Sequence, residues 1–345
     1  MPLALDPLLD VLRAIGEPTR LRIVLLLRHG ELTVTDLTDI LGQSQPRISR
    51  HLKVLAEAGV VDKHREGNRV FFELTAAGPI GELVADVAAR ARIHDPIAAT
   101  DRDRLALVRA RRAAAAQEYF TDIARRWDEL RALHAADDVV EAAIVEAVGD
   151  GDRPLRSIVD LGTGTGRMLQ LLWTPSVERA VGLDSSHSML SVARSNFERA
   201  ELRGIELRQG DVYSPPLEPG AFDLAIIHQV LHFLDDPARA VREAARLLAP
   251  GGRLVIVDFA PHALEFLRTD HAHVRLGFRA DTIAAWLEQS GLDVHEVRAI
   301  DRAHGPGDDD IEHLTVSLWV AVDTKHISID PPADALADHH EETGV

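Results

Sequence analysis

The segment VDLGTGTGRMLQLL, residues 159–172, limits the fold of this chain more than any other stretch. An apolar strand runs into three glycines at alternate positions, and a helix-like run follows directly. Glycine accepts backbone conformations that other residues avoid, so such a turn brings amide hydrogens close to a ligand at a helix N-terminus. The segment therefore predicts a nucleotide-binding strand, turn and helix. A dinucleotide fingerprint requires glycine where Arg167 stands, which disfavours a pyrophosphate ligand.

Strands and helices keep alternating after this turn. The apolar runs RAVGLDSS and IELRQGD end in Asp184 and Asp211, and FDLAIIHQVLHFL, the helix PARAVREAARLLAP and GGRLVIVDF follow. Asp184 stands 22 residues after Gly162, a spacing at which a carboxylate can accept hydrogen bonds from ribose hydroxyls. Asp211 is suitably placed for an adenine amino group. The alternation predicts an α/β fold with a doubly wound, Rossmann-like sheet and ligands at the carboxyl ends of its strands.

The N-terminal region has a different pattern. Apolar spacing indicates two helices interrupted by GEPTR, a short helix in TVTDLTDILG, and a helix capped by Ser44 with Ile48, Leu52 and Leu55 on one face. The segment VVDKHREGNRVFFELT then alternates around EGN, a hairpin signal. This order predicts a winged helix-turn-helix, in which the second helix of the pair enters the major groove and the hairpin follows the DNA backbone.

Charge is distributed unevenly along the chain. The net charge of −17 argues against general affinity for nucleic acids, but residues 43–69 carry six basic side chains against three acidic ones. We expect the DNA-binding side chains to include Arg47, Ser49, Arg50, Lys53, Arg65 and Arg69. For His51, a structural hydrogen bond and a base contact are equally plausible.

Length and breaker residues suggest the domain limits. A chain of 345 residues with 46% apolar residues is expected to form at least two domains. We expect a DNA-binding and dimerisation domain at 1–95, a helical connector at 96–150, a ligand-binding domain at 151–322 and a disordered tail at 323–345.

The connector carries an apolar stripe at helical spacing. Tyr119, Ile123, Trp127 and Leu130 fall on one face. Either this stripe packs on the second domain, or Tyr119 and Trp127 form a lid over the ligand. Both alternatives make the connector a rigid coupler rather than a loose tether.

Composition excludes several classes of site. The chain has no cysteine, which removes disulfides and thiolate metal sites, and it has neither a long apolar span nor a signal peptide. We therefore expect a soluble cytoplasmic protein without membrane contact. Asp86, His94 and Asp95, after the predicted hairpin, are poorly grouped for a metal, and we expect no metal site.

Three N-terminal segments, IGEPTRLRIVLLL, SQPRISRHLKVLAEAGVV and REGNRVFFELT, resemble the ArsR/SmtB-type bacterial regulators over roughly residues 5–90. The resemblance implies a homodimer on a double-stranded DNA operator, with the helix that begins near Pro79 packing across the dimer. It also places Gln45, Arg47, Ser49, Arg50 and His51 near DNA. Members of that family that sense arsenic or soft metals use cysteines, so sensing must lie elsewhere in this chain.

Five segments in order, from VDLGTGTG through GLDSSHSML and GDVYSPPL to LTVSLWVAV, look like a class I S-adenosylmethionine-dependent methyltransferase over about residues 115–322. The resemblance implies S-adenosylmethionine or S-adenosylhomocysteine as the bound cofactor. It implies that Asp160, Gly162, Gly164 and Gly166 hold the methionine end, Asp184 the ribose and Asp211 the adenine, while His228 lines the pocket.

Two functions fit this combination. It resembles regulators of methionine metabolism that respond to S-adenosylhomocysteine, which implies a repressor whose second domain binds a small-molecule effector. The alternative is an active small-molecule methyltransferase with an autoregulatory DNA-binding domain. Methyl transfer needs mainly alignment, so lack of an evident base does not exclude it. HQVLHF in place of an N-P-P-Y type motif argues against methylation of DNA bases, and the absence of cysteine against methylation of arsenic.

Histidines and carboxylates gather on the expected acceptor side of the second domain. They are Asp258, His262, Glu265, His271 and His273, beside His228 and His232. This group can be a general base, a metal site or the polar rim of a helical cap, and His228 and His262 are the candidates for a catalytic role.

Overall fold

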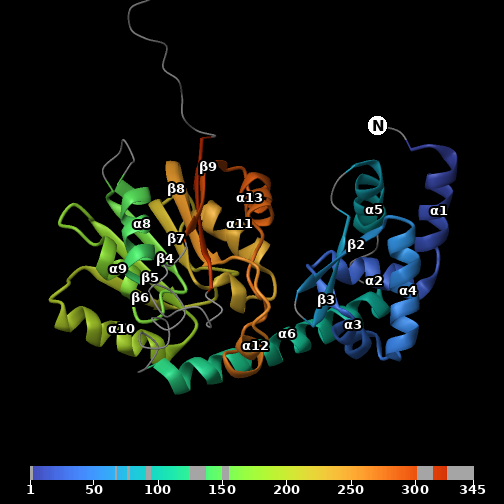
Figure 1. Ribbon diagram of the computed structural model, residues 1–345, viewed down its shortest axis with the longest axis horizontal. Coiled ribbons are helices and arrows are strands. Elements are labelled where there is room, and N and C mark those ends of the chain that lie inside the picture. The colour runs from blue at the N-terminus through green and yellow to red at the C-terminus, as the bar shows by residue number, and fades with distance from the viewer. Residues whose placement is uncertain are drawn as a thin grey trace, which may run out of the picture.

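Two folded units are joined by one long helix, α6 (Pro96–Ile123), in the computed structural model (Figure 1). The structure describes residues 3–66, 68–75, 78–90, 95–124, 137–149, 155–300 and 314–324. His94, Trp127, Leu130 and the tail from residue 325 onward lie outside these ranges, and the expectations for them stay untested. No helix in the described part of the chain is long and apolar enough to cross a membrane.

The N-terminal unit is a winged helix-turn-helix, as predicted. Its helices are α1 (Leu5–Ile15), α2 (Pro18–Leu27), α3 (Val34–Leu41), α4 (Gln45–Glu57) and α5 (Gly78–Arg90). Its sheet has the order β1 (Leu32–Thr33), β3 (Arg69–Leu74), β2 (Val61–Glu66). A capping box between Thr33 and Asp36 starts α3, and Gly42 ends it in the left-handed conformation. The predicted face of α4 is buried at Ile48, Leu52 and Leu55.

The second unit is built on a seven-stranded sheet. In chain order its strands are β4 (Ser157–Leu161), β5 (Arg179–Asp184), β6 (Ile205–Gln209), β7 (Phe222–His228), β8 (Leu248–Phe259), β9 (Asp293–Ile300) and β10 (Val316–Val322). They are arranged as β6-β5-β4-β7-β8-β10-β9, and only β10 runs antiparallel to its neighbours. The strand order reverses at β4, between β5 and β7, which is where such sheets open a ligand crevice.

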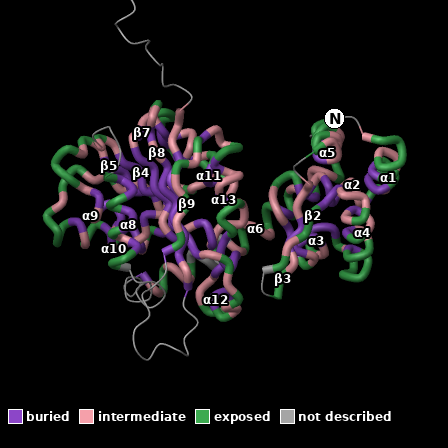
Figure 2. Tube along the Cα trace, turned by 45° about the horizontal axis from the view of Figure 1, so that its top comes forward, coloured by how far each residue is buried: buried purple, intermediate pink, exposed green. Residues whose placement is uncertain are grey.

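Helices cover both faces of this sheet. They are α8 (Asp137–Gly149), α9 (Arg167–Leu172), α10 (His187–Arg199), α11 (Pro237–Leu247), α12 (Phe266–Asp270) and α13 (Ala280–Gln289), with the short 3₁₀ helix η2 (Leu231–Phe233) after β7. Two apolar clusters result, one holding Ile144 and Leu169 and the other Val241 and Ile283. The strands are accordingly the most buried part of the unit (Figure 2). The doubly wound α/β fold predicted from the alternation is confirmed.

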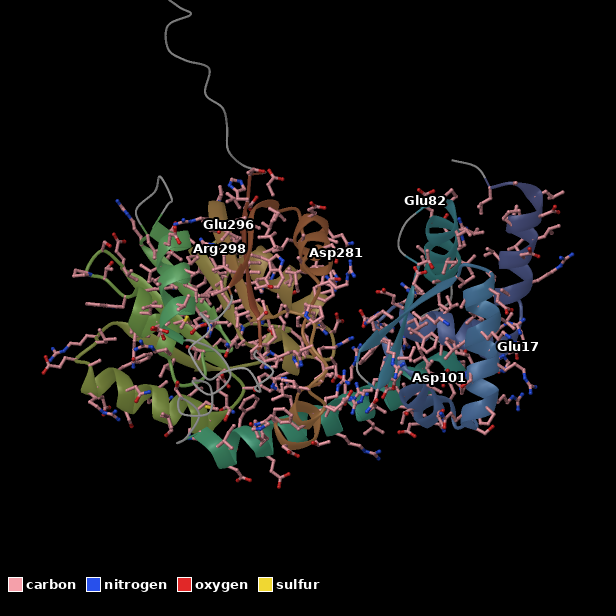
Figure 3. All side chains as sticks on the ribbon, viewed as in Figure 1. Glu17, Glu82, Asp101, Asp281, Glu296 and Arg298 are labelled. Atoms are coloured by element: carbon pink, nitrogen blue, oxygen red, sulfur yellow. The ribbon has the colours of Figure 1, made fainter. Side chains whose placement is uncertain are left out.

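Helix α6 contacts both units. Near its start, buried Asp101 (Figure 3) accepts two hydrogen bonds of 2.6 Å from Arg22 of α2, and Arg104 donates to the carbonyl of Ile40 in α3. Near its end, the ring of Phe120 meets Phe233 of η2, with centroids 4.8 Å apart. At 1.5 Å per residue, the helix is about 42 Å long, so one rigid element reaches from α2 and α3 to the large sheet.

Candidate functional site

The glycine turn after β4 needs each of two glycines for a different reason. Gly162 has φ 79°, and a Cβ there would lie 2.5 Å from the side chain of Val230. Gly166 has φ 82°, and a Cβ there would lie 2.5 Å from Phe197 of α10. Gly162 thus lets the backbone approach the neighbouring loop, while Gly166 permits packing of the turn against a helix.

A cavity of about 320 Å³ opens beside this turn, at the carboxyl ends of β4, β5 and β7. Its lining includes six of the predicted cofactor residues: Asp160, Gly162, Gly164, Asp184, Asp211 and His228. Gly166 and the catalytic candidate His262 are not among the lining residues. The strand ends therefore bring together most of a predicted site that is scattered over the sequence.

Asp160 and Asp184 are two carboxylates in the cavity wall, of which Asp160 is buried and Asp184 half-buried. Asp160 is 1% exposed and accepts a 2.6 Å hydrogen bond from the Thr163 hydroxyl. Burial, and less strongly the charge of Asp184, raise the pKa of Asp160 to about 7. Burial also raises the pKa of Asp184, although its oxygens accept 2.8 Å bonds from the amides of Gly164 and Ser186. A ligand with positive charge and hydroxyl donors would satisfy such a pair.

Asp211 and Gln229 also line the cavity. Asp211 is exposed, and its carboxylate is oriented by the amide of Tyr213 at 2.8 Å. Gln229, directly after β7, is buried and has φ 54°, a conformation that costs a residue other than glycine of order 1–3 kcal/mol. Sequence analysis did not single out Gln229, because only the backbone angle marks it.

Connector helix α6 closes one side of the cavity. Phe120 of α6 lines it together with Phe233. Its neighbour Tyr119, one of the two residues in the lid alternative, forms a 2.7 Å hydrogen bond with Nδ1 of His271. Burial raises the pKa of Tyr119 to about 12, so its hydroxyl stays protonated. Tyr119 therefore packs on the second unit, as in the first alternative, whereas Phe120 forms part of the cavity wall.

The predicted DNA-reading residues of α4 share one exposed face. Exposed side chains are Gln45, Arg47, Ser49, Arg50 and Lys53. His51 is half-buried, with Nδ1 3.5 Å from the Glu17 carboxylate, and burial lowers its pKa. Its contact with Glu17 favours the structural alternative for His51.

Comparisons with known proteins match both units. Residues 17–63 match the family model described as "Bacterial regulatory protein, arsR family", and residues 159–256 match "Methyltransferase domain". The chain joins an arsR-family domain to a methyltransferase domain. The arsR-family domain is 41% identical over 87 residues to the HTH-type transcriptional repressor SmtB of Mycobacterium tuberculosis, covering 25% of this chain and 64% of that protein.

The methyltransferase domain has relatives of its own. It is 38% identical over 153 residues to the demethylmenaquinone methyltransferase of Thermus thermophilus, covering 41% of this chain and 64% of that enzyme. Among solved structures, a Haloferax volcanii methyltransferase in complex with the activator Trm112 aligns with a TM-score of 0.49 and 21% identity, over 59% of this chain and 97% of that one. The matched segments span between 30% and 64% of the curated relatives' own lengths.

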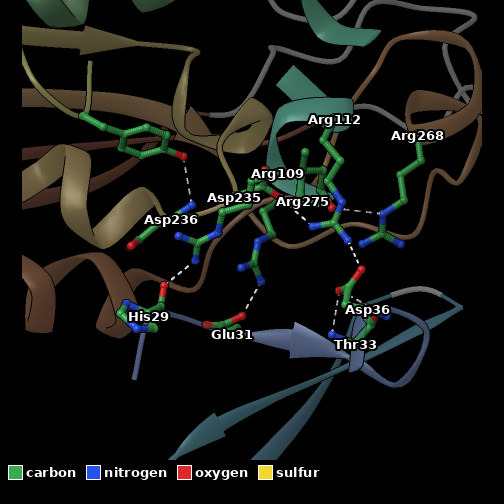
Figure 4. Close-up of polar contacts among 12 residues, drawn as sticks. His29, Glu31, Thr33, Asp36, Arg109, Arg112, Asp235, Asp236, Arg268 and Arg275 are labelled. Atoms are coloured by element: carbon green, nitrogen blue, oxygen red, sulfur yellow. Dashed lines mark hydrogen bonds and ion pairs between the residues drawn. The ribbon is translucent and has the colours of Figure 1, made fainter. Parts of the chain in front are cut away.

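Arginines connect the arsR-family domain with the methyltransferase domain (Figure 4). Arg112 of α6 donates both to Asp36, the capping carboxylate of α3, and to Asp235, which lines the cofactor cavity. Arg109, one turn earlier, donates to the carbonyl of His29. The arsR-family domain and the cavity wall are thus linked through a single side chain.

The hairpin of the arsR-family domain also meets the methyltransferase domain. At its tip, the amide of Asn68 donates to Oε1 of Glu265 at 2.6 Å. Partial loss of hydration, with the charges of Arg268 and Arg112, lowers the pKa of Arg69. Arg69 therefore lies close to the methyltransferase domain, and Arg65, the other predicted DNA contact of the hairpin, is exposed on β2.

The histidine and carboxylate group of the methyltransferase domain divides into separate contacts. His232 and Asp258 form a buried pair, with Nδ1 2.7 Å from Oδ1, and His273 lies against the His232 ring at 4.2 Å between centroids. His262 lies farther along the loop after β8, its Nδ1 accepting from the amide of Leu264 at 3.3 Å. In the part of the chain that the structure describes, this group does not bring three donor atoms close enough for one metal ion. A structural role under the cavity wall fits the His232–Asp258 pair.

Proposed function

We propose that this protein is a DNA-binding transcriptional repressor whose methyltransferase domain binds S-adenosylmethionine or S-adenosylhomocysteine as an effector. The observation that carries the proposal is the double contact of Arg112. This side chain binds the cap of α3, the first helix of the helix-turn-helix pair, and also the cavity residue Asp235. A ligand that moves Asp235 would alter the ion pair between Asp235 and Arg112. Because Arg112 also binds Asp36, the change would reach the start of α3.

The cavity residues fit the adenosyl group. S-adenosylmethionine carries an ammonium and a sulfonium charge, and Asp160 and Asp184 supply carboxylates in the cavity wall. We propose that Asp160 and the glycine turn hold the methionine end, Asp184 the ribose and Asp211 the adenine. The volume of about 320 Å³ lies in the range of small-molecule sites.

The exposed face of α4 supports the DNA side of the proposal. We propose that the residues Gln45, Arg47, Ser49, Arg50 and Lys53 contact the operator, together with Arg65 and Arg69 of the hairpin. A homodimer would present two such faces to the half-sites of a palindrome.

The test combines calorimetric titration of each ligand with operator binding measured with and without it. A coupling of about 1–3 kcal/mol would change operator affinity roughly 5- to 150-fold. Asp184→Asn should weaken ligand binding by about 1–3 kcal/mol, whereas Glu178→Gln, on the surface at the opposite end of β5, should not. Operator affinity that is the same with saturating amounts of either ligand would exclude the effector role.

A second candidate is methyl transfer to a small molecule. Similarity to demethylmenaquinone methyltransferases favours it, as does the aromatic wall of Phe120 and Phe233, which suits an apolar acceptor. Incubation with S-adenosylmethionine labelled in its methyl group, across candidate acceptors, separates the two. Labelled product that Asp184→Asn abolishes would establish the enzyme, and regulation and catalysis can coexist in one chain.

A further inference from the structure

Three side chains of types that can ligate a metal ion lie together on the hairpin sheet of the arsR-family domain. They are Glu31, directly before β1, His64 of β2 and Glu73 of β3, and one donor atom of each lies within 4.8 Å of the others. The cofactor cleft does not include them. We propose that Glu31, His64 and Glu73 form a binding site for a first-row divalent metal ion such as Zn²⁺. This inference does not depend on the proposed function.

Strand register explains why these residues meet. Leu32 pairs with Phe72 across β1 and β3, which sets the preceding Glu31 opposite Glu73. His64 pairs with Phe71 across β2 and β3. Residues two apart on a strand share a face, so Glu73 and the pair of His64 and Phe71 project from the same side of the sheet. Three neighbouring strands therefore preorganise the donors without any loop rearrangement.

Donor chemistry and spacing suit such an ion. One imidazole nitrogen and two carboxylates form a set used for zinc, with ligand distances of about 2.0–2.2 Å, so that donors in a tetrahedral shell lie about 3.4 Å apart. His64 Nε2 already lies 3.5 Å from Glu31 Oε2. The side chain of His64 is 39% exposed, and the two glutamates line a cavity of about 300 Å³ between the domains. An ion can therefore reach the site and retain water.

Arg275 of the methyltransferase domain now neutralises this site. Its guanidinium donates to Oε2 of Glu31 and lies over the Phe71 ring, 4.2 Å from the centroid, and the residue is 3% exposed. Burial and the charge of Glu31 also raise the pKa of Glu73. The two neighbouring glutamates thus favour a positive charge beside them, and a metal ion would compete with Arg275 for Glu31.

The experiment uses the full chain with His326→Ala, His339→Ala and His340→Ala, which together remove the three histidine donors of the tail. Zn²⁺ affinity is measured by competition with a chromogenic chelator, and Co²⁺ serves as the spectroscopic probe. We expect one ion per chain, and a loss of about tenfold or more in affinity from either His64→Gln or Glu73→Gln. His187→Gln, an exposed histidine on α10, is the matched control and should leave affinity unchanged.

Arg275→Gln provides a result of opposite sign. Removing the competing guanidinium should tighten Zn²⁺ binding several-fold, which a folding defect would not do. A circular dichroism spectrum and a melting temperature that match those of the parent would verify that each variant is folded. The proposal is overturned if the double variant His64→Gln, Glu73→Gln binds Zn²⁺ as tightly as its parent, if the parent binds no ion at millimolar Zn²⁺, or if Arg275→Gln weakens binding.

Discussion

Asp160 shows how a single buried group links the cavity to stability. Its carboxyl lies in the core of the methyltransferase domain, with a pKa of about 7 against 3.8 for an ordinary aspartate. Because the folded pKa is the higher one, the native state holds a proton that the unfolded chain releases. The associated stabilisation is complete below pH 3.8 and is lost as the pH rises toward 7.

Asp160→Asn should therefore stabilise the ligand-free protein at pH 8 relative to the parent, by a few kcal/mol, and bring little gain at pH 4. Asparagine keeps an acceptor for the Thr163 hydroxyl without a buried charge. Urea unfolding of both proteins at the two pH values measures the difference. A stability difference that does not depend on pH would show that Asp160 titrates normally.

Arg112 is the residue on which communication between the domains should depend. Arg112→Gln removes the charge that binds Asp36 and Asp235 together, so a ligand-induced change in operator affinity of 5- to 150-fold should fall to about one. Titrations of operator and ligand, separately and together, measure the loss. Arg111→Gln, the exposed neighbour on α6, is the control. Full coupling in Arg112→Gln would reject this route.

At the scale of the element, helix α6 contacts the arsR-family domain and also lines the cavity of the methyltransferase domain. The sequence predicted long helices between residues 98 and 148, because alanine and charged residues dominate there and breakers are few. It did not predict that Phe120 would reach the cavity or that Arg112 would bridge Asp36 and Asp235. Those partners lie 76 and 123 residues from Arg112 in the sequence, and periodicity reports only on neighbours along the chain.

The candidate site likewise divides into residues that local sequence patterns predict and contacts between residues far apart in the sequence. Asp184 and Asp211 were predicted because each follows an apolar strand, and parallel strands end at one edge of the sheet. Glu31 and Arg275 were not, because 244 residues separate them. The glycine turn was predicted to bring the backbone close to a ligand, which stays a prediction; only the structure shows that Gly162 lies against Val230 and Gly166 against Phe197.

Breaking α6 between its contacts should uncouple the domains. Ala114 is exposed and lies between Arg112 and Phe120. Ala114→Pro removes a backbone hydrogen bond and kinks the helix at a cost of about 3 kcal/mol or more, whereas Ala114→Gly costs only about 1 kcal/mol. Fluorescence anisotropy with labelled operator should show that the proline variant binds DNA without responding to ligand. An intact response in the proline variant would argue against α6 as the coupler.

At the scale of the whole molecule, the expected homodimer has a candidate surface on α1. Leu5 and Leu12 are 70% and 43% exposed and stand seven residues apart, so they share one face of the helix. Large apolar side chains exposed together often mark a protein interface. A charged side chain at these two positions would oppose association.

Leu5→Asp combined with Leu12→Asp should therefore shift the chain from dimer to monomer in sedimentation velocity, and weaken operator binding in parallel. Leu107→Asp, which changes an exposed leucine of α6, is the control, since it lies outside α1. A protein that sediments as a dimer with both aspartates present would place the contact elsewhere.

The hydrogen bond from the Asn68 amide to Glu265 limits what the tip of the hairpin can bind. A phosphate that approaches the hairpin tip seeks the same amide and is repelled by the same carboxylate. While the Asn68 amide is bonded to Glu265 of the methyltransferase domain, it cannot bind a phosphate of the DNA backbone. If the hairpin tip binds an operator as we propose, Glu265 must first withdraw, so that contact of the Asn68 amide with DNA and this closed arrangement exclude each other.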